Sequence, residues 1–324
     1  MDLSLYSSSR FDPRRTEAFP AVAWTIGSAC LTGALLEVST HPKPGLVTPR
    51  SMGAHADMDL QTFMLTSAAI APCFHRCAAI GLRHGARRSF VLPMVRAIGL
   101  HYDDLLFGAS NGVNTQRGAL FVLGVVAAAA GAAHSSDAFF SPDSIFAAVS
   151  EITAGLVERE LVASSGAANT AGRLLYARHG LTGIRGEVEA GLPAVAKHGL
   201  PALRQALAAG HSLNRALVHT LMAIAVAVED TTVVWRGGPE ALKFVQREAA
   251  RIMALGGALE DAGLAEVNLF AEACLASRLS LGGSADLLAV TAAIHLLEAG
   301  SFPASATKQF EPIRSDTSVP GENL

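Results

Sequence analysis

The 324-residue sequence has few cysteines, few aromatic residues and few charges, and these shortages exclude some classes of protein. Its four cysteines show no spacing typical of a metal site, and we interpret them as buried apolar side chains of a reduced, cytoplasmic protein. The formal net charge of −3 provides no basic surface for nucleic acid. We therefore expect neither a cysteine metal site nor a nucleic-acid partner.

Long hydrophobic runs are also missing. The longest uncharged apolar run, GALFVLGVVAAAAGAA at 118–133, has 16 residues, and a bilayer span needs roughly 20. The first residues, MDLSLYSSSRFDPRR, contain no apolar core typical of a signal peptide. We therefore expect no membrane partner, and we interpret 118–133 as a buried helix.

What is abundant is small and aliphatic: half of the chain is apolar, mostly alanine, leucine and valine, which favours packed helices. The fold prediction is all-α, a single compact multi-helix bundle with the active site at converging helix breaks. The catalytic domain is expected over 16–301, with loose tails at 1–15 and 302–324. Apolar periodicity predicts helices at about 17–39, 60–83, 89–107, 114–132, 143–162, 212–228, 239–255, 261–278 and 284–299, with a turn-rich stretch at 163–200. TTVVW at 231–235 is the one short β-like run.

The first helix break holds an unusual amount of polar chemistry. In HPKPG, two prolines stiffen the backbone around Lys43. In GAHADMD, His55, Asp57 and Asp59 precede the next apolar run, and Asp59 is suited to cap it. The functional interpretation is a lysine for phosphate beside reactive carboxylates. The alternative is a rigid connector with a solvated lysine and a plain N-cap.

Two further breaks carry arginines beside glycines. GVNTQRGALF places Asn114, Thr115 and Arg117 at the start of an apolar helix. Free N–H groups at a helix N-terminus, together with an arginine, suit an anion. LTGIRGEVEAGLP contributes Arg185 to the same set of phosphate candidates. An ordinary helix cap is the alternative for the first of these motifs.

The last two breaks combine acids with glycine. VEDTTVVWRGG places Glu229 and Asp230 at the expected end of a helix, where acids are unfavourable unless a cation compensates, and adds Arg236 for an anion. GGSADLL combines Gly282 and Gly283, which permit close backbone approach to a ligand, with Asp286. Taken together, the breaks predict an Mg²⁺–polyphosphate site with oxygen ligands from Asp57, Glu229, Asp230 and Asp286.

The motifs EVSTHPKPGLV, GAHADMD, GVNTQRGALF, YARHGLTGIRGEVEAGLPAV, LVHTLMAIAVAVEDTTVVWRGG and LSLGGSADLLAVT occur in this order. Together they resemble the triphosphoribosyl-dephospho-CoA synthase family over about residues 17–300. Members of that family serve citrate lyase and malonate decarboxylase. The resemblance implies an all-helical enzyme that joins ATP to the 2′-hydroxyl of 3′-dephospho-CoA and releases adenine. The product is the precursor of an acyl-carrier-protein prosthetic group, made before the holo-carrier synthase step.

The implied reaction is substitution at the ribose C1 of ATP, which builds oxocarbenium character on the sugar. On this basis Asp57 or Asp59 is expected to act as base or cation stabiliser, and His55 as the acid for adenine. Lys43, Arg117, Arg185 and Arg236 are expected to hold phosphates, with Asn114, Thr115, Gly282 and Gly283 beside them. The residues of these motifs favour malonate decarboxylase over citrate lyase as the enzyme that the product serves. A homodimer is also expected.

Two other functions use the same residues. A helical Mg²⁺-dependent hydrolase of N-glycosidic bonds would use water where the synthase uses a hydroxyl. A non-catalytic assembly partner of a decarboxylase would use the polar breaks as docking loops, and it would not bind ATP.

Overall fold

The chain folds as layered helices, as the apolar periodicity predicts. The structure, a computed structural model, describes residues 19–134, 140–162 and 170–307. Over these residues it contains no strand, only an isolated bridge between Thr48 and Ser51. The all-α prediction is therefore confirmed. The α-helices are α1 (Ala21–Ser39), α2 (Leu60–His84), α3 (Val91–Ala109), α4 (Arg117–Ala133), α5 (Pro142–Thr153), α6 (Ala171–His179), α7 (Gly183–Glu189), α8 (Leu200–Ala208), α9 (Leu213–Ala225), α10 (Thr231–Ala254), α11 (Asp261–Ala276), α12 (Gly282–Ala299) and α13 (Ala304–Thr307).

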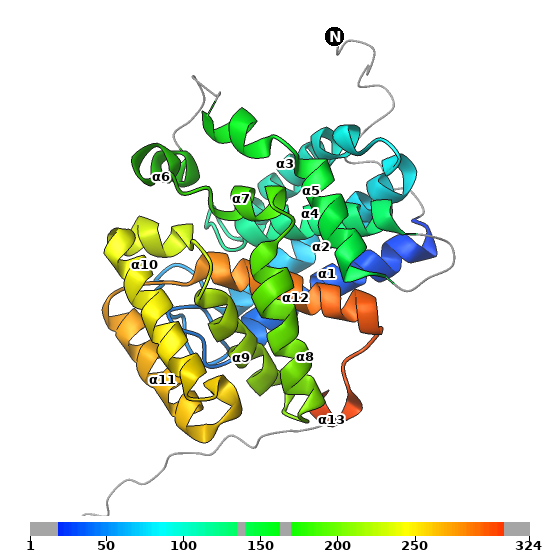
Figure 1. Cartoon of the computed structure of the whole chain (residues 1–324). Coiled ribbons are helices and arrows are strands. Elements are labelled where there is room, and N and C mark those ends of the chain that lie inside the picture. Colours follow the sequence, from blue (N-terminus) through cyan, green and yellow to red (C-terminus); the bar gives the residue numbers. More distant parts are fainter. Residues whose placement is uncertain (1–18, 135–139, 163–169, 308–324) are drawn as a thin grey trace, which may run out of the picture.

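Four helices, α1, α2, α4 and α12, form the centre of the molecule, and the others surround them (Figure 1). Small residues let their axes approach closely. A Cβ on Gly33 of α1 would lie 2.2 Å from the carbonyl oxygen of Ala289 in α12, and one on Gly81 of α2 would lie 1.9 Å from that of Ala128 in α4. The richness in glycine and alanine is thus a packing requirement of this core. The run 118–133 is buried as predicted, since its residues from Leu120 to Ala130, apart from Phe121, are inaccessible or nearly so.

In the part of the chain that the structure describes, two helices satisfy the length and composition of a membrane span. They are α1 and α2, and about half of each is buried inside the protein, 44% and 50% of the respective windows. In this structure both helices belong to the central layer.

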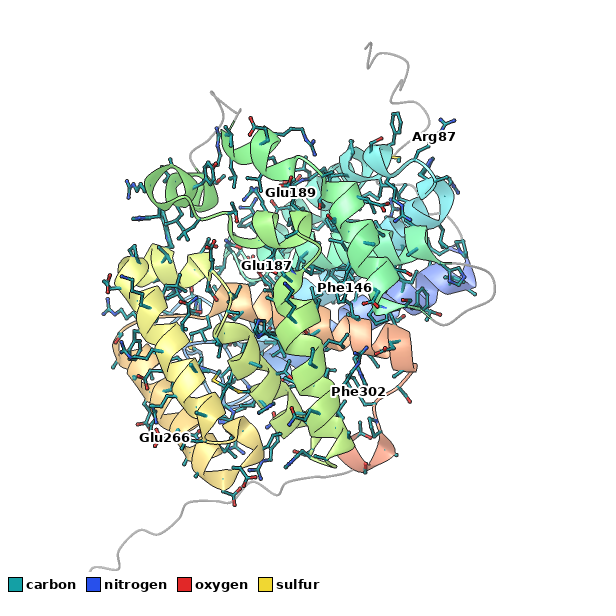
Figure 2. All side chains as sticks on the ribbon, viewed as in Figure 1. Arg87, Phe146, Glu187, Glu189, Glu266 and Phe302 are labelled. Carbon is teal, nitrogen blue, oxygen red and sulfur yellow. The ribbon has the colours of Figure 1, made fainter. Side chains whose placement is uncertain are left out.

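Several element boundaries differ from the sequence prediction. The β-like run 231–235 is the first turn of α10, which begins at Thr231 and is interrupted at Gly238, where φ is +76°. The helix expected over 212–228 ends at Ala225. The stretch expected to be turn-rich contains α6 and α7, while 163–169 lie outside the described residues. Glu189 at the end of α7 (labelled in Figure 2) accepts hydrogen bonds from the N–H groups of Gly155 (2.7 Å) and Val157 (2.8 Å).

Residues that follow the expected domain end at 301 also contact the core. Phe302 stacks on His295 of α12 with ring centroids 5.0 Å apart, and Ala306 in α13 is buried in the main core (Figure 2). The expected tail at 1–15, and residues 308–324 of the expected tail at 302–324, lie outside the described residues.

Candidate active site

The predicted polar breaks come together where α1 ends and where α4, α10 and α12 begin. Asp230 is at the centre of this arrangement. It is the N-cap of α10, and its Oδ1 accepts hydrogen bonds from the N–H groups of Thr232 (3.0 Å) and Val233 (3.2 Å). The same carboxylate accepts three more from the start of α12: from Gly283 N–H (3.1 Å), Ser284 N–H (2.8 Å) and the Ser284 hydroxyl (2.9 Å). Asp230 thus joins two helix N-termini.

This geometry corrects the sequence argument about Asp230. Because α9 ends at Ala225, Asp230 does not oppose a helix dipole but lies at the favourable, N-terminal end of α10. Burial raises the pKa of Asp230, and the hydrogen bonds from Ser284, Gly283 and Val233 act in the opposite direction. Its oxygen lone pairs are committed to helix starts, so it is poorly suited to bind a metal ion.

Gly282 and Gly283 serve this junction directly. A Cβ on Gly283 would lie 3.1 Å from Asp230 Oδ1, and one on Gly282 would lie 2.8 Å from the Thr232 hydroxyl. The sequence predicted a close approach to a ligand at these glycines; the structure shows instead that the two glycines let the start of α12 approach the side chains of Asp230 and Thr232 at the start of α10.

Asp286 is the carboxylate that remains without a cation. It lies in the first turn of α12 and reaches the start of α4, where a Cβ on Gly118 would be 1.9 Å from its Oδ2. The Ala119 N–H donates a hydrogen bond to it, and it forms no salt bridge to a described residue. Burial raises the pKa of Asp286 well above its ordinary value, and the negative charges of Glu37 and Asp230 raise it further.

Lys43 is enclosed rather than presented to a ligand. Its side chain is 1% exposed, and its Nζ donates hydrogen bonds to the backbone oxygen of Glu37 (2.7 Å) and to the Glu37 carboxylate. Burial lowers the pKa of Lys43, while Glu37 opposes that shift. The prediction that the proline-stiffened arm holds Lys43 out towards phosphate is therefore corrected: the arm holds it inward, against α1.

Sequence reasoning missed Glu37. The only signal was an acid six residues before the lysine within EVSTHPKPG, and a helix end followed by a proline-constrained loop hides that proximity. In the structure Glu37 pairs with the buried lysine, and its negative charge raises the pKa of Asp286.

His55 and Arg236 fasten the loop before α2. Arg236 donates to the carbonyl oxygens of Ala54 (2.9 Å) and Arg278 (3.1 Å) and to His55 Nδ1 (3.1 Å). Because Nδ1 accepts, Nε2 carries the proton and donates to the Ser280 hydroxyl (3.1 Å). Burial lowers the pKa of His55, and the Arg236 charge lowers it further, so the ring is neutral at pH 7.

The two aspartates of GAHADMD have different positions. Asp59 forms a capping box at the start of α2, accepting from Thr62 N–H (2.8 Å), and this hydrogen bond lowers its pKa. Asp57 is exposed. Only Asp57 is therefore free for a ligand, and the plain-cap interpretation holds for Asp59.

The predicted phosphate residues divide into two groups. Arg117 is about half exposed and forms a bidentate pair with Asp103, both contacts 2.7 Å, at the start of α4. Beside it, Asn114 is exposed and the Thr115 hydroxyl donates to that of Thr66 (3.3 Å). Arg185 of α7 pairs instead with Glu160 (2.8 Å), which also binds Arg96.

Glu229 is exposed, and Glu187 of α7 lies close enough to feel its charge. Burial is the main reason that the pKa of Glu187 is raised, and the negative charge of Glu229 adds to it (Glu187 is labelled in Figure 2). Among the described residues, no three histidine, cysteine, aspartate or glutamate side chains form a group that could hold a metal ion. Asp57, Glu229, Asp230 and Asp286 therefore do not form such a group in this structure.

Comparisons with known proteins agree with the motifs. The sequence model of a family described as ATP:dephospho-CoA triphosphoribosyl transferase matches residues 23–302. A Malonomonas rubra protein named as a probable 2-(5''-triphosphoribosyl)-3'-dephosphocoenzyme-A synthase is 41% identical over 87% of this chain and 90% of its own. Synthases of the same name from Pectobacterium atrosepticum and Klebsiella pneumoniae are 42% and 37% identical, over 79% and 88% of this chain and 83% and 95% of theirs. No solved structure matches.

Proposed function

Because the chain belongs to the ATP:dephospho-CoA triphosphoribosyl transferase family, we propose that it transfers the triphosphoribosyl group of ATP to the 2′-hydroxyl of 3′-dephospho-CoA. The bond between ribose C1 and adenine breaks, the bond between C1 and the acceptor oxygen forms, and adenine leaves. The observation that supports this best is Asp286, a partly buried carboxylate without a cation at a junction of helix N-termini.

Asp286 has the properties that the reaction requires of a carboxylate. A base near neutral pH needs a pKa above that of an ordinary aspartate, and burial beside Glu37 and Asp230 supplies the shift. In the proposal Asp286 takes the acceptor proton as the sugar develops positive charge. The surrounding N–H groups of α4, α10 and α12 keep the junction rigid, and Asp57 remains the second carboxylate of the mechanism.

The proposal gives the cations and His55 separate tasks. Arg117, with Asn114 and Thr115 beside it, contacts phosphate, because its side chain is about half exposed at the start of α4. His55, proton-bearing at Nε2, stays neutral and fixes the loop, so the proton for adenine comes from solvent or from Asp286. Lys43 acts through Glu37 by holding negative charge beside Asp286.

Mg²⁺ enters this scheme as part of the substrate, MgATP. Mg²⁺ is commonly held by substrate phosphates and one or two carboxylates, with water completing its shell. That mode suits a chain whose described residues hold no ready group of ligands. Glu229 and Asp57, both exposed, are the proposed carboxylates within reach of the phosphates.

We further propose that the product serves malonate decarboxylase, in a cytoplasmic, homodimeric enzyme. The motif wording and the Malonomonas rubra relative support the first point. The four free, buried cysteines support a reduced compartment. Exposed apolar side chains such as Leu65 and Leu269 support self-association, which light scattering after gel filtration would measure.

The test of the activity is direct. Incubation with ATP, Mg²⁺ and 3′-dephospho-CoA should yield equal amounts of free adenine and the triphosphoribosyl adduct by mass spectrometry. Adenine released at the same rate without dephospho-CoA would instead identify an N-glycosidic hydrolase. No ATP binding would favour an assembly partner. Transfer of the product to the malonate decarboxylase carrier protein, compared with the citrate lyase carrier, tests the pathway.

A further inference from the structure

A small pocket lies between α2, α3 and α4, and Arg117 is its one lining residue to which the proposed function gives a role. Its volume is about 110 Å³. The side chains around it are mostly apolar, with three charged groups among them: Cys73, Cys77, Val95, Arg96, Gly99, Leu100, Asp103, Arg117, Leu120, Phe121 and Gly124.

Gly99 lines this pocket, and no neighbouring atom requires a glycine at this position. A Cβ on Gly99, in the middle of α3, would meet no atom within 4 Å. Glycine in a helix interior is about 0.5–1 kcal/mol less stable than alanine. At Gly33 and Gly81 a neighbouring backbone requires glycine, but at Gly99 none does. What glycine provides at this position is open space above the pocket.

The lining suits a ligand that is apolar at one end and anionic at the other. Val95, Leu120 and Phe121 supply an apolar surface. Arg96 lies over the Phe121 ring, 4.2 Å from its centroid, while it pairs with Glu160. Arg117 is paired with Asp103 but remains about half exposed, so an incoming anion has access to it.

The pocket also adjoins the proposed reaction site. Arg117 lines the pocket, and the next residue, Gly118, contacts Asp286. The pocket and Asp286 therefore both lie at the start of α4, close enough for one extended ligand to contact both.

We propose that this pocket binds part of the pantetheine arm of 3′-dephospho-CoA, with the adjoining diphosphate on Arg117. This inference rests on the proposed function. Of the two substrates, only dephospho-CoA has an aliphatic segment, and that segment is attached directly to a diphosphate. The triphosphoribosyl part of ATP is polar throughout. A volume of about 110 Å³ is too small for the whole arm, and it suits the branched dimethyl portion next to the diphosphate.

The chain offers a matched pair of variants to test this. Gly99→Leu fills the pocket. Gly108→Leu is the control: a Cβ added at Gly108, also in α3, would meet no atom within 4 Å, and Gly108 does not line the pocket. Calorimetric titration with 3′-dephospho-CoA should show affinity lowered about 10–100-fold in Gly99→Leu, a range typical of a misfit in an apolar pocket. Gly108→Leu should bind as the wild type does. Both variants should keep the wild-type melting temperature or exceed it.

Two further titrations separate this inference from the proposed function. ADP, which carries the diphosphate and lacks the arm, should bind Gly99→Leu and wild type equally, and so should MgATP. Unchanged dephospho-CoA affinity in Gly99→Leu would overturn the pocket assignment, and so would an equal loss for ADP or MgATP. Adenine release by the wild type reports on the proposed function alone, since these titrations require no turnover.

Discussion

At the scale of single residues, the main result is that similar-looking acids have different tasks. Asp59 and Asp230 satisfy helix N-termini, Glu37 neutralises a buried lysine, and Asp286 is partly buried and forms no salt bridge to a described residue. A change of aspartate to asparagine should therefore have different consequences at Asp230 and at Asp286, because one carboxylate supports structure and the other is available for chemistry.

Asp286→Asn should lower kcat about 10²–10⁴-fold, the range typical of losing a general base, while the protein stays folded. The raised pKa also predicts the effect of pH on stability. A carboxyl group whose pKa is higher in the folded than in the unfolded protein stabilises the fold below its unfolded pKa, and this contribution is lost as pH rises through the folded value. Urea unfolding from pH 4 upward should thus show a shallower loss of stability in Asp286→Asn.

The matched comparison is Asp230→Asn, which should lower stability and activity together because an amide nitrogen faces backbone N–H donors. Equal turnover of Asp286→Asn and wild type would remove Asp286 from the mechanism.

Lys43→Ala should reduce the free energy of unfolding by about 3–5 kcal/mol, since it leaves the Glu37 carboxylate buried and unpaired beside Asp286. Urea denaturation measures this, and Lys243→Ala is the control. Lys243 forms an exposed pair with Glu240, so its loss should change stability by less than about 1 kcal/mol. If Lys43→Ala kept wild-type stability and lost only ATP affinity, Lys43 would be the phosphate ligand first expected from the sequence.

At the scale of elements, glycines decide how closely the central helices pack. The α2–α4 contact depends on Gly81 and on Gly131, where a Cβ would lie 2.3 Å from the carbonyl oxygen of Ala78. The α3 glycines Gly99 and Gly108 have no neighbouring backbone within 4 Å of an added Cβ. The effect of an added methyl group should therefore depend on the helix that receives it.

Gly81→Ala should destabilise the protein by about 1–3 kcal/mol, because the methyl group overlaps the backbone of α4. Gly99→Ala, in open space on α3, should instead stabilise it by up to about 1 kcal/mol through helix propensity. Thermal unfolding of the two variants should shift in opposite directions. A stabilising Gly81→Ala would contradict the close α2–α4 packing.

At the scale of the whole molecule, one apolar core extends from α1 to α13 and encloses every cysteine. Cys30, Cys73, Cys77 and Cys274 are each no more than 1% exposed, and burial raises the pKa of Cys274 to about 12. A thiol that is both inaccessible and protonated does not react.

The native protein should therefore react with a thiol reagent such as Ellman's reagent far more slowly than the unfolded protein, which should expose all four thiols. Titration with and without guanidinium chloride measures both. Rapid reaction of Cys73 or Cys77 in the native state would show that the pocket beside them opens to the solvent. Bound 3′-dephospho-CoA should slow any such reaction.

The sequence by itself determined the helical class, the burial of the run 118–133, the Asp59 cap and the family. These features depend on short-range periodicity, on local capping chemistry and on ordered motifs, all of which can be identified in the amino-acid sequence. It also predicted that the glycines at 282 and 283 permit a close backbone approach to a ligand, whereas the groups that lie against them in the structure are Thr232 and Asp230.

Only the tertiary structure decided which polar groups meet. Asp230 and Ser284 are 54 residues apart and share hydrogen bonds, and His55 and Ser280 are 225 apart. No periodicity encodes such separations, so the sequence could not tell that Asp230 caps two helices. The direction in which Lys43 points was hidden for a related reason. A stiff loop fixes its own backbone, but whether it carries a lysine outward or inward depends on the helix packed behind it, and here α1 presents Glu37.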